Sequence, residues 1–239
     1  MNDRQVRLLN AIITEYIKTA EPVGSVELVK RYNLRYSPAT ARNEMARLLE
    51  QGFLEMLHTS SGRVPTPQAY RYFLQELLEE VELPVLQEVA MKQRLWGDRF
   101  DVDKLIRNAV ITLAEQVHEL AIALTDDNYL VSSGAVNILD HKEFWDIDAA
   151  KTALYLLDRP EVLRELFEKS SLGEEVISLI GKELGIENLS GCCLLYTRFN
   201  TGKKGGYVAV FGPVRMRYDQ IIPAVRYTKN LIQELGESW

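Results

Sequence analysis

The feature that most constrains the fold is a helix whose two ends are both marked in the sequence. Residues 37–52 read SPATARNEMARLLEQG, so Ser37 can cap the helix, Pro38 fills its first position and Gly52 ends it. At about 100° per residue, the apolar side chains share one face: Ala41, Met45, Leu48 and Leu49. Polar side chains share the other face: Thr40, Asn43 and Arg47. The pattern predicts an amphipathic helix with one side against a core.

The first turn of this helix lacks an acidic residue, and the first one to follow is Glu44. Acidic side chains normally favour that turn because the helix dipole is positive there. Free amides and a positive dipole suit phosphate oxygens. Ser-Pro helix starts are common, so this feature alone is weak evidence for an anion site.

Two helices are expected before this one. The first runs from a cap at Asn2 or Asp3 to about Thr19. Its predicted core stripe repeats at three and four residues: Val6, Leu9, Ile13, Tyr16 and Ile17. After the break AEPVGS, Ser25 is expected to cap a short helix over about 26–32, which presents three side chains inward: Leu28, Val29 and Tyr32.

A small hairpin and another helix are expected after Gly52. FLEML reads as a strand, HTSSG as a turn and RVP as a short return strand. Thr66 and Pro67 then begin a helix through about Glu80. Three helices followed by a hairpin are the order of a winged helix-turn-helix.

In a winged helix-turn-helix the third helix enters the major groove with its N-terminus first. Asn43 is suited to adenine, Arg47 to guanine or phosphate, and Arg63 in the wing to phosphate or the minor groove. Arg42 is assigned to a phosphate or to helix packing. His58 also reads as an ordinary turn residue, and the polar face of the helix also reads as a solvated surface. The full set of candidate DNA-binding residues is Ser37, Ala39, Thr40, Arg42, Asn43, Arg47, His58, Ser61 and Arg63.

The distribution of charge supports a polyanionic partner more than the total does. The net charge is −6, but Lys30–Arg71 contains seven basic and three acidic residues, a local charge of +4. The rest of the chain therefore carries −10. A basic segment in an acidic chain is typical of nucleic-acid binding, although surface variation also produces it.

The remainder predicts an α+β domain behind a linker. The acidic passage EEVELPVLQE suggests a linker over 81–101. Helices are expected over 102–118, KEFWDIDAAKTALYLLD, PEVLRELFEKS, EEVISLIGKELG and 218–235. Strands are expected around the Asp-Asp-Asn turn of LAIALTDDNYLVSSG, and in CCLLYTRFN and GYVAVFG, which the turn TGKKGG joins.

This domain presents no catalytic or metal-binding pattern. TGKKGG lacks the spacing of a phosphate-binding P-loop, and His58, His118 and His141 are scattered. Arg215 and Arg217 in GPVRMRY suggest a structural corner or an interdomain contact. No enzyme activity, cofactor or metal is therefore expected.

The expected compartment is a reducing cytoplasm. Cys192 and Cys193 are adjacent, so a strand points them to opposite faces and a disulfide between them is unfavourable. No apolar run approaches the ~20 residues that a spanning helix needs, and no membrane association is expected.

Several stretches resemble the heat-inducible transcription repressor family HrcA. The N-terminal matches are EPVGS, SPATARNEM, GFLE, HTSSGRVPT and YRYFLQELL. The C-terminal matches are SGAVNILDHKEFWD, IGKELGIENL and VFGPVRMRYDQIIPAVRY. The resemblance implies a winged helix-turn-helix domain (1–80), a linker (81–101) and a GAF-like α+β domain (102–239). It also implies a cytoplasmic, nucleoid-associated homodimeric repressor of chaperone genes that binds an inverted repeat called CIRCE, is supported by the chaperonin GroEL and is released on heat stress.

The sequence departs from the family pattern in three places. Ala41 replaces a usual isoleucine, and Val26 replaces a frequent arginine. The chain is also shorter before SGAVN, which implies a reduced dimerisation insert. Two other functions fit the same pattern: a ligand-sensing winged-helix regulator of other genes, and a winged helix that docks a protein rather than DNA.

Overall fold

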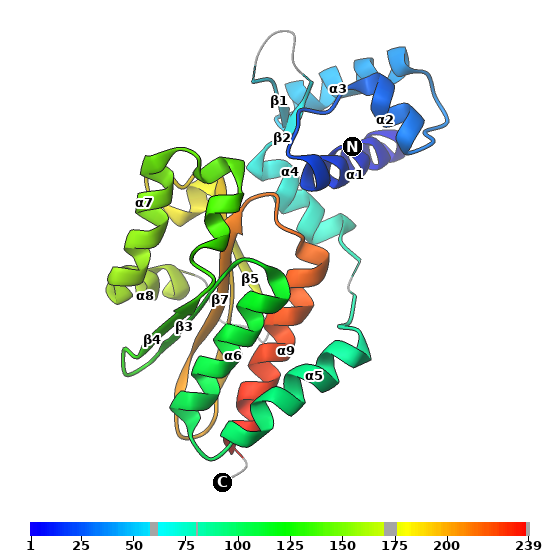
Figure 1. Ribbon diagram of the computed structural model, residues 1–239. Helices are drawn as coiled ribbons and strands as arrows, with labels where there is room; N and C mark the ends of the chain where they lie inside the picture. The colour runs from blue at the N-terminus through cyan, green and yellow to red at the C-terminus, as the bar shows by residue number, and fades with distance from the viewer. Residues whose placement is uncertain (58–61, 80, 170–175, 238–239) are drawn as a thin grey trace. The chain divides into compact units, whose positions relative to one another are not determined.

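The computed structural model describes residues 1–57, 62–79, 81–169 and 176–237. The chain divides into two compact units, Met1–Glu79 and Glu80–Trp239 (Figure 1). The first unit contains α1 (Asp3–Thr19), α2 (Ser25–Arg31), α3 (Pro38–Glu50), β1 (Leu54–Glu55), β2 (Val64–Pro65), α4 (Pro67–Tyr72) and a π-helical turn, η1 (Phe73–Leu77).

Helix α1 is the central element of the first unit. The predicted cap is confirmed, because the Asn2 side chain accepts a hydrogen bond from the Gln5 amide and the Gln5 side chain bonds back to Asn2. The buried face is broader than predicted: Gln5, Leu8, Leu9, Ala11, Ile12, Ile13 and Glu15. The expected Val6, Tyr16 and Ile17 are only half-buried. The face shifts because α1 packs against α3, β2, α4 and α2 together.

Helix α2 is joined to α1 through a buried carboxylate. The Glu15 carboxylate forms an ion pair with Arg31 and accepts a hydrogen bond of 3.2 Å from the Tyr32 hydroxyl. Burial, together with Glu15, raises the pKa of Tyr32 to about 12. The expected cap is wrong by one residue, because Gly24 is the N-cap and Ser25 is already helical and buried. Leu28 is buried as predicted, while Val29 and Tyr32 are half-buried.

Helix α3 and the hairpin follow the predicted boundaries closely. Ala41, Met45 and Leu48 are buried, and Gly52 adopts a positive φ of 80° just after the helix. Strands β1 and β2 pair antiparallel. The Thr66 hydroxyl then donates 2.7 Å to the Gly52 carbonyl and also caps α4, which ties the end of α3 to the start of α4.

The second unit is a mixed α+β structure built on a five-stranded antiparallel sheet with the order β4-β3-β7-β6-β5. Its strands are β3 (Leu120–Thr125), β4 (Leu130–Ser133), β5 (Ile177–Ile180), β6 (Cys192–Asn200) and β7 (Gly205–Pro213). Its α-helices are α5 (Val85–Leu95), α6 (Val102–Val117), α7 (Ile147–Tyr155), α8 (Pro160–Glu168) and α9 (Tyr218–Glu237). Its 3₁₀ turns are η2 (Trp96–Asp98), η3 (Asn137–Asp140), η4 (Lys142–Phe144), η5 (Leu156–Asp158) and η6 (Gly181–Leu184).

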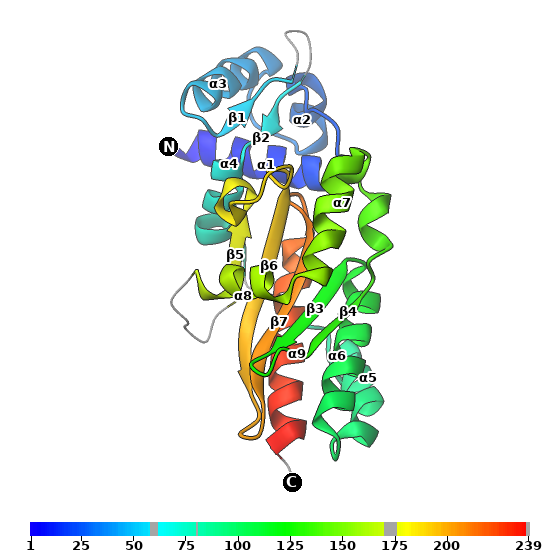
Figure 2. The same cartoon turned by 90° about the vertical axis from the view of Figure 1, so that its left-hand side faces the viewer.

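Helices cover both faces of this sheet (Figure 2). Alternate residues of β3, including Leu120, Ile122 and Leu124, pack with α7 and α8 in one hydrophobic cluster. Helices α6 and α9 pack on each other and on the sheet. Because side chains alternate along a strand, Ala121 and Ala123 face these two helices, which the small side chains allow to approach closely.

The range 81–101, expected as a linker, contains α5 and the 3₁₀ turn η2. Met91 and Leu95 of α5 are buried. Helix α5 also contacts α9, because the Tyr227 hydroxyl donates 3.0 Å to the Glu88 carbonyl. The acidic composition of the segment did not reveal this packing.

The helix expected over EEVISLIGKELG is wrong in its described part, which excludes Glu174 and Glu175. Ile177–Ile180 form β5, and Gly181–Leu184 form the 3₁₀ turn η6. Strand β5 pairs with β6 at the edge of the sheet, from Ile177 opposite Tyr196 to Ile180 opposite Cys193. Pairing with a distant strand therefore overrides the local helical pattern. Among the described residues, the helices are too short or too polar to cross a membrane.

Candidate nucleic-acid interface

The N-terminus of α3 is exposed and carries no acidic residue in its first turn. The Ser37 hydroxyl oxygen accepts a hydrogen bond of 3.1 Å from the Thr40 amide, and Pro38 supplies no amide hydrogen. Helix geometry leaves the Ala39 amide without an intrahelical acceptor. Fewer amides are free at this helix end than the sequence suggested. The Ala39 amide and the positive end of the helix dipole are still available to bind an anion.

The outward face of α3 presents Arg42, Asn43 and Arg47, all exposed. Arg47 forms an ion pair of 3.1 Å with Glu44, whose side chain is only 6% exposed while that of Arg47 is 61% exposed. Sequence reasoning treated Glu44 only as the first acid of the helix and missed this i,i+3 pair. Arg47 is therefore partly neutralised, whereas Arg42 forms no ion pair within the described part of the chain.

The hairpin is fixed to the loop that precedes α2. Val23 and Arg63 form an antiparallel bridge with backbone hydrogen bonds of 2.9 and 3.0 Å. A Cβ on Gly62 would lie 2.7 Å from backbone atoms of Pro22 and Val23, so only glycine fits this close approach. The bridge therefore joins the segment around Val23 to Gly62 and Arg63, and it fixes the backbone of Arg63. Nothing in the local sequence signals this long-range bridge.

The predicted site residues fall on two elements. Ser37 is the N-cap of α3, and the next five lie in the helix: Ala39, Thr40, Arg42, Asn43 and Arg47. Arg63 lies at the start of the return strand, beside Val23. His58 and Ser61 lie outside the described residues. The arrangement exposes hydrogen-bonding groups suited to base edges and phosphates, and it holds them on packed elements.

The second unit contains a partly buried charged network where the segments SGAVNILDHKEFWD and GPVRMRY meet. His141 Nε2 lies 2.9 Å from Glu119 Oε2, and Arg215 Nε donates 2.8 Å to Glu143 Oε1. Burial raises the pKa of Glu119. Of the two expected roles for Arg215, the structural corner fits, because its partners lie in the same unit. Arg217 is exposed and lies 3.9 Å from Asp219.

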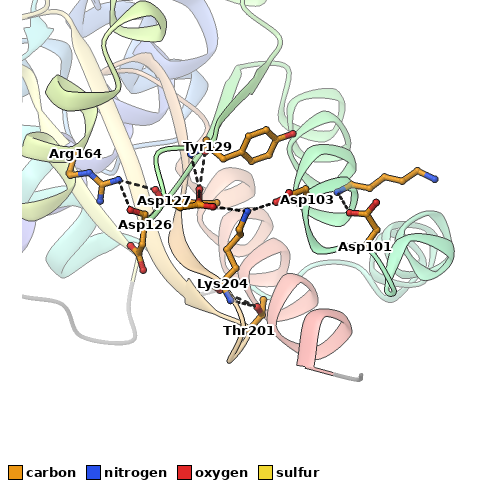
Figure 3. A network of polar contacts seen from close by, with 10 residues as sticks. Asp101, Asp103, Asp126, Asp127, Tyr129, Arg164, Thr201 and Lys204 are labelled. Atoms are coloured by element: carbon orange, nitrogen blue, oxygen red, sulfur yellow. Dashed lines mark hydrogen bonds and ion pairs between the residues drawn. The ribbon is translucent and has the colours of Figure 1, made fainter.

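The turn expected over TGKKGG occupies residues 201–204, since Gly205 and Gly206 already belong to β7, and its second lysine is held by carboxylates (Figure 3). Lys204 Nζ contacts Asp103 and lies 3.0 Å from Asp127, with the Tyr129 ring 5.4 Å away. The Thr201 hydroxyl bonds to the Lys204 backbone. Lys204 is therefore engaged within the protein. No cluster of three or more potential metal ligands occurs among the residues that the structure describes.

Comparisons with known proteins converge on one family. The model described as HrcA protein C terminal domain matches residues 46–222. The heat-inducible transcription repressor HrcA of Pelotomaculum thermopropionicum is 27% identical over 98% of this chain and 97% of that protein. The HrcA of Desulforudis audaxviator is 29% identical over 98% of both chains. The HrcA of Clostridium acetobutylicum is 37% identical over 58% of this chain and 41% of that protein.

The fold also has a counterpart among solved structures. A crystal structure of a hypothetical protein at 2.2 Å resolution has a TM-score of 0.84 and 19% identity, covering 100% of this chain and 99% of that one. The alignment with the Pelotomaculum protein spans 337 positions, while this chain has 239 residues. At least 98 of those positions therefore face a gap in this chain.

Proposed function

Because the chain belongs to the HrcA family, we propose that it represses transcription of heat-shock genes by occupying operator DNA. The relatives that align along nearly all of the chain are named heat-inducible transcription repressors. The acid-free, exposed N-terminus of α3 is the observation in the structure that supports DNA as the partner.

In this proposal the first unit acts as a winged helix-turn-helix. Helix α3 enters the major groove with Ser37, Ala39 and Thr40 leading, and Asn43 reads an adenine. Arg42 binds the phosphate backbone, and Arg47 leaves Glu44 to reach a guanine or a phosphate. Arg63 contacts the backbone or the minor groove beside the wing. His58 and Ser61 belong to the proposed set by their place in the hairpin sequence.

The proposed operator is the inverted repeat CIRCE, bound by a homodimer. A palindromic site presents the same bases twice, so a two-fold symmetric protein places one α3 in each half-site. The second unit acts as a GAF-like domain with a reduced dimerisation insert, which agrees with the 98 or more alignment positions that face a gap. Such a repressor works in the bacterial cytoplasm, on the nucleoid.

The proposed response to heat acts through folding. Domains are stabilised by only ~5–15 kcal/mol, so a modest temperature rise lowers the fraction of folded repressor. Loss of folded repressor empties the operator. In this proposal the chaperonin GroEL restores the active form.

The test measures binding to a duplex that carries the inverted repeat. Fluorescence anisotropy gives the affinity and footprinting gives the protected bases. The mass of the free protein is measured in parallel. We expect protection of both half-sites and at least ~10³-fold weaker binding to a scrambled duplex. A further variant, Arg63→Ala, weakens binding to both duplexes and makes the salt slope shallower by about one unit.

Two results would contradict this proposal. Equal affinity for the repeat and the scrambled duplex would contradict sequence-specific repression. An affinity that does not fall as the salt concentration rises would exclude contact with phosphates, because log affinity falls linearly with log salt when counterions are released. A thermal shift with small metabolites, but none with the duplex, would favour the ligand-sensing regulator instead.

A further inference from the structure

A cleft on the first unit lies between the N-terminal half of α1 and the turn that connects α2 to α3. Its volume is about 740 Å³. Its lining includes Arg4, Arg7 and Asn10 from α1 and Arg35 and Tyr36 from the turn. None of these residues belongs to the set assigned above to the interface.

The cleft gathers cations that the protein does not neutralise. Arg4, Arg7 and Arg35 form no ion pair with a carboxylate in 1–57, 62–79, 81–169 or 176–237, and Asp3 is the acidic residue of the lining. Arg31 in the same unit behaves differently, because it contacts both Glu15 and Glu27. Ion pairing within the protein therefore does not explain the three arginines of the cleft.

One of these arginines lies over the aromatic ring that lines the cleft. The guanidinium carbon of Arg4 lies 5.8 Å from the centre of the Tyr36 ring. Burial raises the pKa of Tyr36; Arg4 and Arg7 act in the opposite direction, and the Glu44 carboxylate adds to the increase. Arg4 and Arg7 therefore both lie near enough to act on Tyr36, a residue that lines the cleft.

The position of the cleft connects it to α3. Tyr36 lines the cleft, and the next residue, Ser37, is the N-cap of α3. Each strand of a duplex carries a negative charge about every 3.4 Å along the axis. A DNA strand that lies beside the N-terminus of α3 would therefore also place phosphates beside the cleft. Guanidinium groups match phosphate oxygens through two parallel hydrogen bonds.

We propose that Arg4, Arg7 and Arg35 bind backbone phosphates of the same duplex whose major groove receives α3. The inference rests on the proposed function and extends the contact surface from α3 to α1. The ligand is the sugar–phosphate backbone, so these contacts add affinity on every sequence and no base preference.

The test measures the full-length chain by fluorescence anisotropy on a duplex with the inverted repeat and on a scrambled duplex, over a range of KCl concentrations. The variants are Arg4→Gln, Arg7→Gln and Arg35→Gln, with Arg35→Lys to keep the charge. The control is Arg107→Gln, which removes the same charge from an exposed position on α6 in the second unit. Circular dichroism melting verifies that each variant is folded.

Each glutamine variant is expected to weaken binding to both duplexes on the order of five- to tenfold at 0.1 M salt, and to lower the salt slope by about one unit. Arg35→Lys retains the wild-type slope, and Arg107→Gln changes neither quantity appreciably. The ratio between the two duplexes stays constant for every variant.

Unchanged slopes in all three glutamine variants, with wild-type protein still selecting the inverted repeat, would overturn this inference and leave the proposed function intact. A loss confined to the inverted repeat would also overturn it, because it would make the arginines readers of bases. If the wild-type chain binds neither duplex, both the inference and the proposed function fail.

Discussion

The two units use their charged side chains in different ways. The first has ten basic and nine acidic residues, and the second has eighteen and twenty-five. In the second unit, at least five of the nine arginines contact carboxylates of the protein: Arg94, Arg159, Arg198, Arg215 and Arg217. In the first unit, four arginines form no ion pair with any described residue: Arg4, Arg7, Arg35 and Arg42. Net charge therefore says less about a partner than the number of cations left unpaired.

The two units also differ in whether their charged side chains are buried or exposed. In the second unit helices cover both faces of the sheet, so charged residues near that core must find partners inside the protein. In the first unit the outward face of α3 is exposed. Substitutions of the partly buried charged residues of the second unit should therefore alter folding, and substitutions on the exposed face of α3 should alter binding.

The largest expected effect is in the second unit. Arg215→Met leaves Glu143 and the neighbouring His141–Glu119 pair without the guanidinium, and losing hydrogen bonds to a charged, partly buried group costs about 1.5–3 kcal/mol. Urea unfolding followed by tryptophan fluorescence measures it, because Trp96, Trp145 and Trp239 all lie in the second unit.

The matched control for that variant is Arg217→Met, two residues further on, where the side chain is 63% exposed. It should change the free energy of unfolding by no more than about 0.5 kcal/mol. Equal losses for both variants would mean that pairing does not distinguish the two arginines, and the contrast between the units would weaken.

The next effect is on binding. Asn43→Ala should cost about 1–3 kcal/mol on operator DNA and relax the preference at one base pair, while leaving the urea midpoint unchanged. Anisotropy titrations on a panel of operator variants measure it. An equal loss on scrambled DNA would show that Asn43 does not read a base.

A smaller effect concerns the cap of α3. Ser37→Ala removes the acceptor for the Thr40 amide and should destabilise the first unit by about 1 kcal/mol. Ser37→Asp keeps a good cap but adds a negative charge at this helix end, so it should preserve stability and weaken DNA binding. If the aspartate variant binds DNA as well as wild type does, then phosphates do not approach this end of α3.

The smallest effect is the pH dependence of the Glu119 network. Burial raises the folded-state pKa of Glu119, so the folded protein holds the proton more readily than the unfolded chain does. The ionised carboxylate therefore costs stability above the folded-state pKa, and this cost disappears as pH falls below the ordinary value of 4.5. Relative to wild type, Glu119→Gln should be more favourable at pH 7 than at pH 4.

Urea midpoints of wild type and Glu119→Gln at several pH values measure that difference. The surrounding charged groups, His141, Arg215 and Glu143, are present in both proteins, so the comparison reports on Glu119 together with its contact to His141. A difference that grows towards pH 4 would contradict the assignment of burial as the dominant influence.

Much of the first unit could be predicted because its signals are local. The ends of α3 depend on Ser37, Pro38 and Gly52, which act within one turn of the helix. The Arg47–Glu44 pair could also have been predicted from the sequence, since i,i+3 neighbours share a helix face. The Val23–Arg63 bridge was not, because it joins segments about forty positions apart that carry no pairing signal.

The second unit was harder to predict because its elements depend on distant partners. Ile177–Ile180 has a periodicity compatible with a helix, and only pairing with β6 makes it a strand. The acidic residues around α5 resemble a linker, yet Met91 and Leu95 are buried against the rest of the unit. Burial of Glu119 beside His141 likewise requires the sheet to be assembled first.

The most direct measurement is site-specific crosslinking from the leading end of α3. Cys192 and Cys193 are 1% and 0% exposed, so a cysteine introduced as Ala39→Cys can be labelled selectively with a photoactivated crosslinker. Lys151→Cys, at an exposed position of α7, is the control. We predict crosslinks from position 39 to bases within each half of the inverted repeat, and none from position 151. Bound protein that yields no crosslink to these bases from position 39 would contradict the insertion of α3 into the groove.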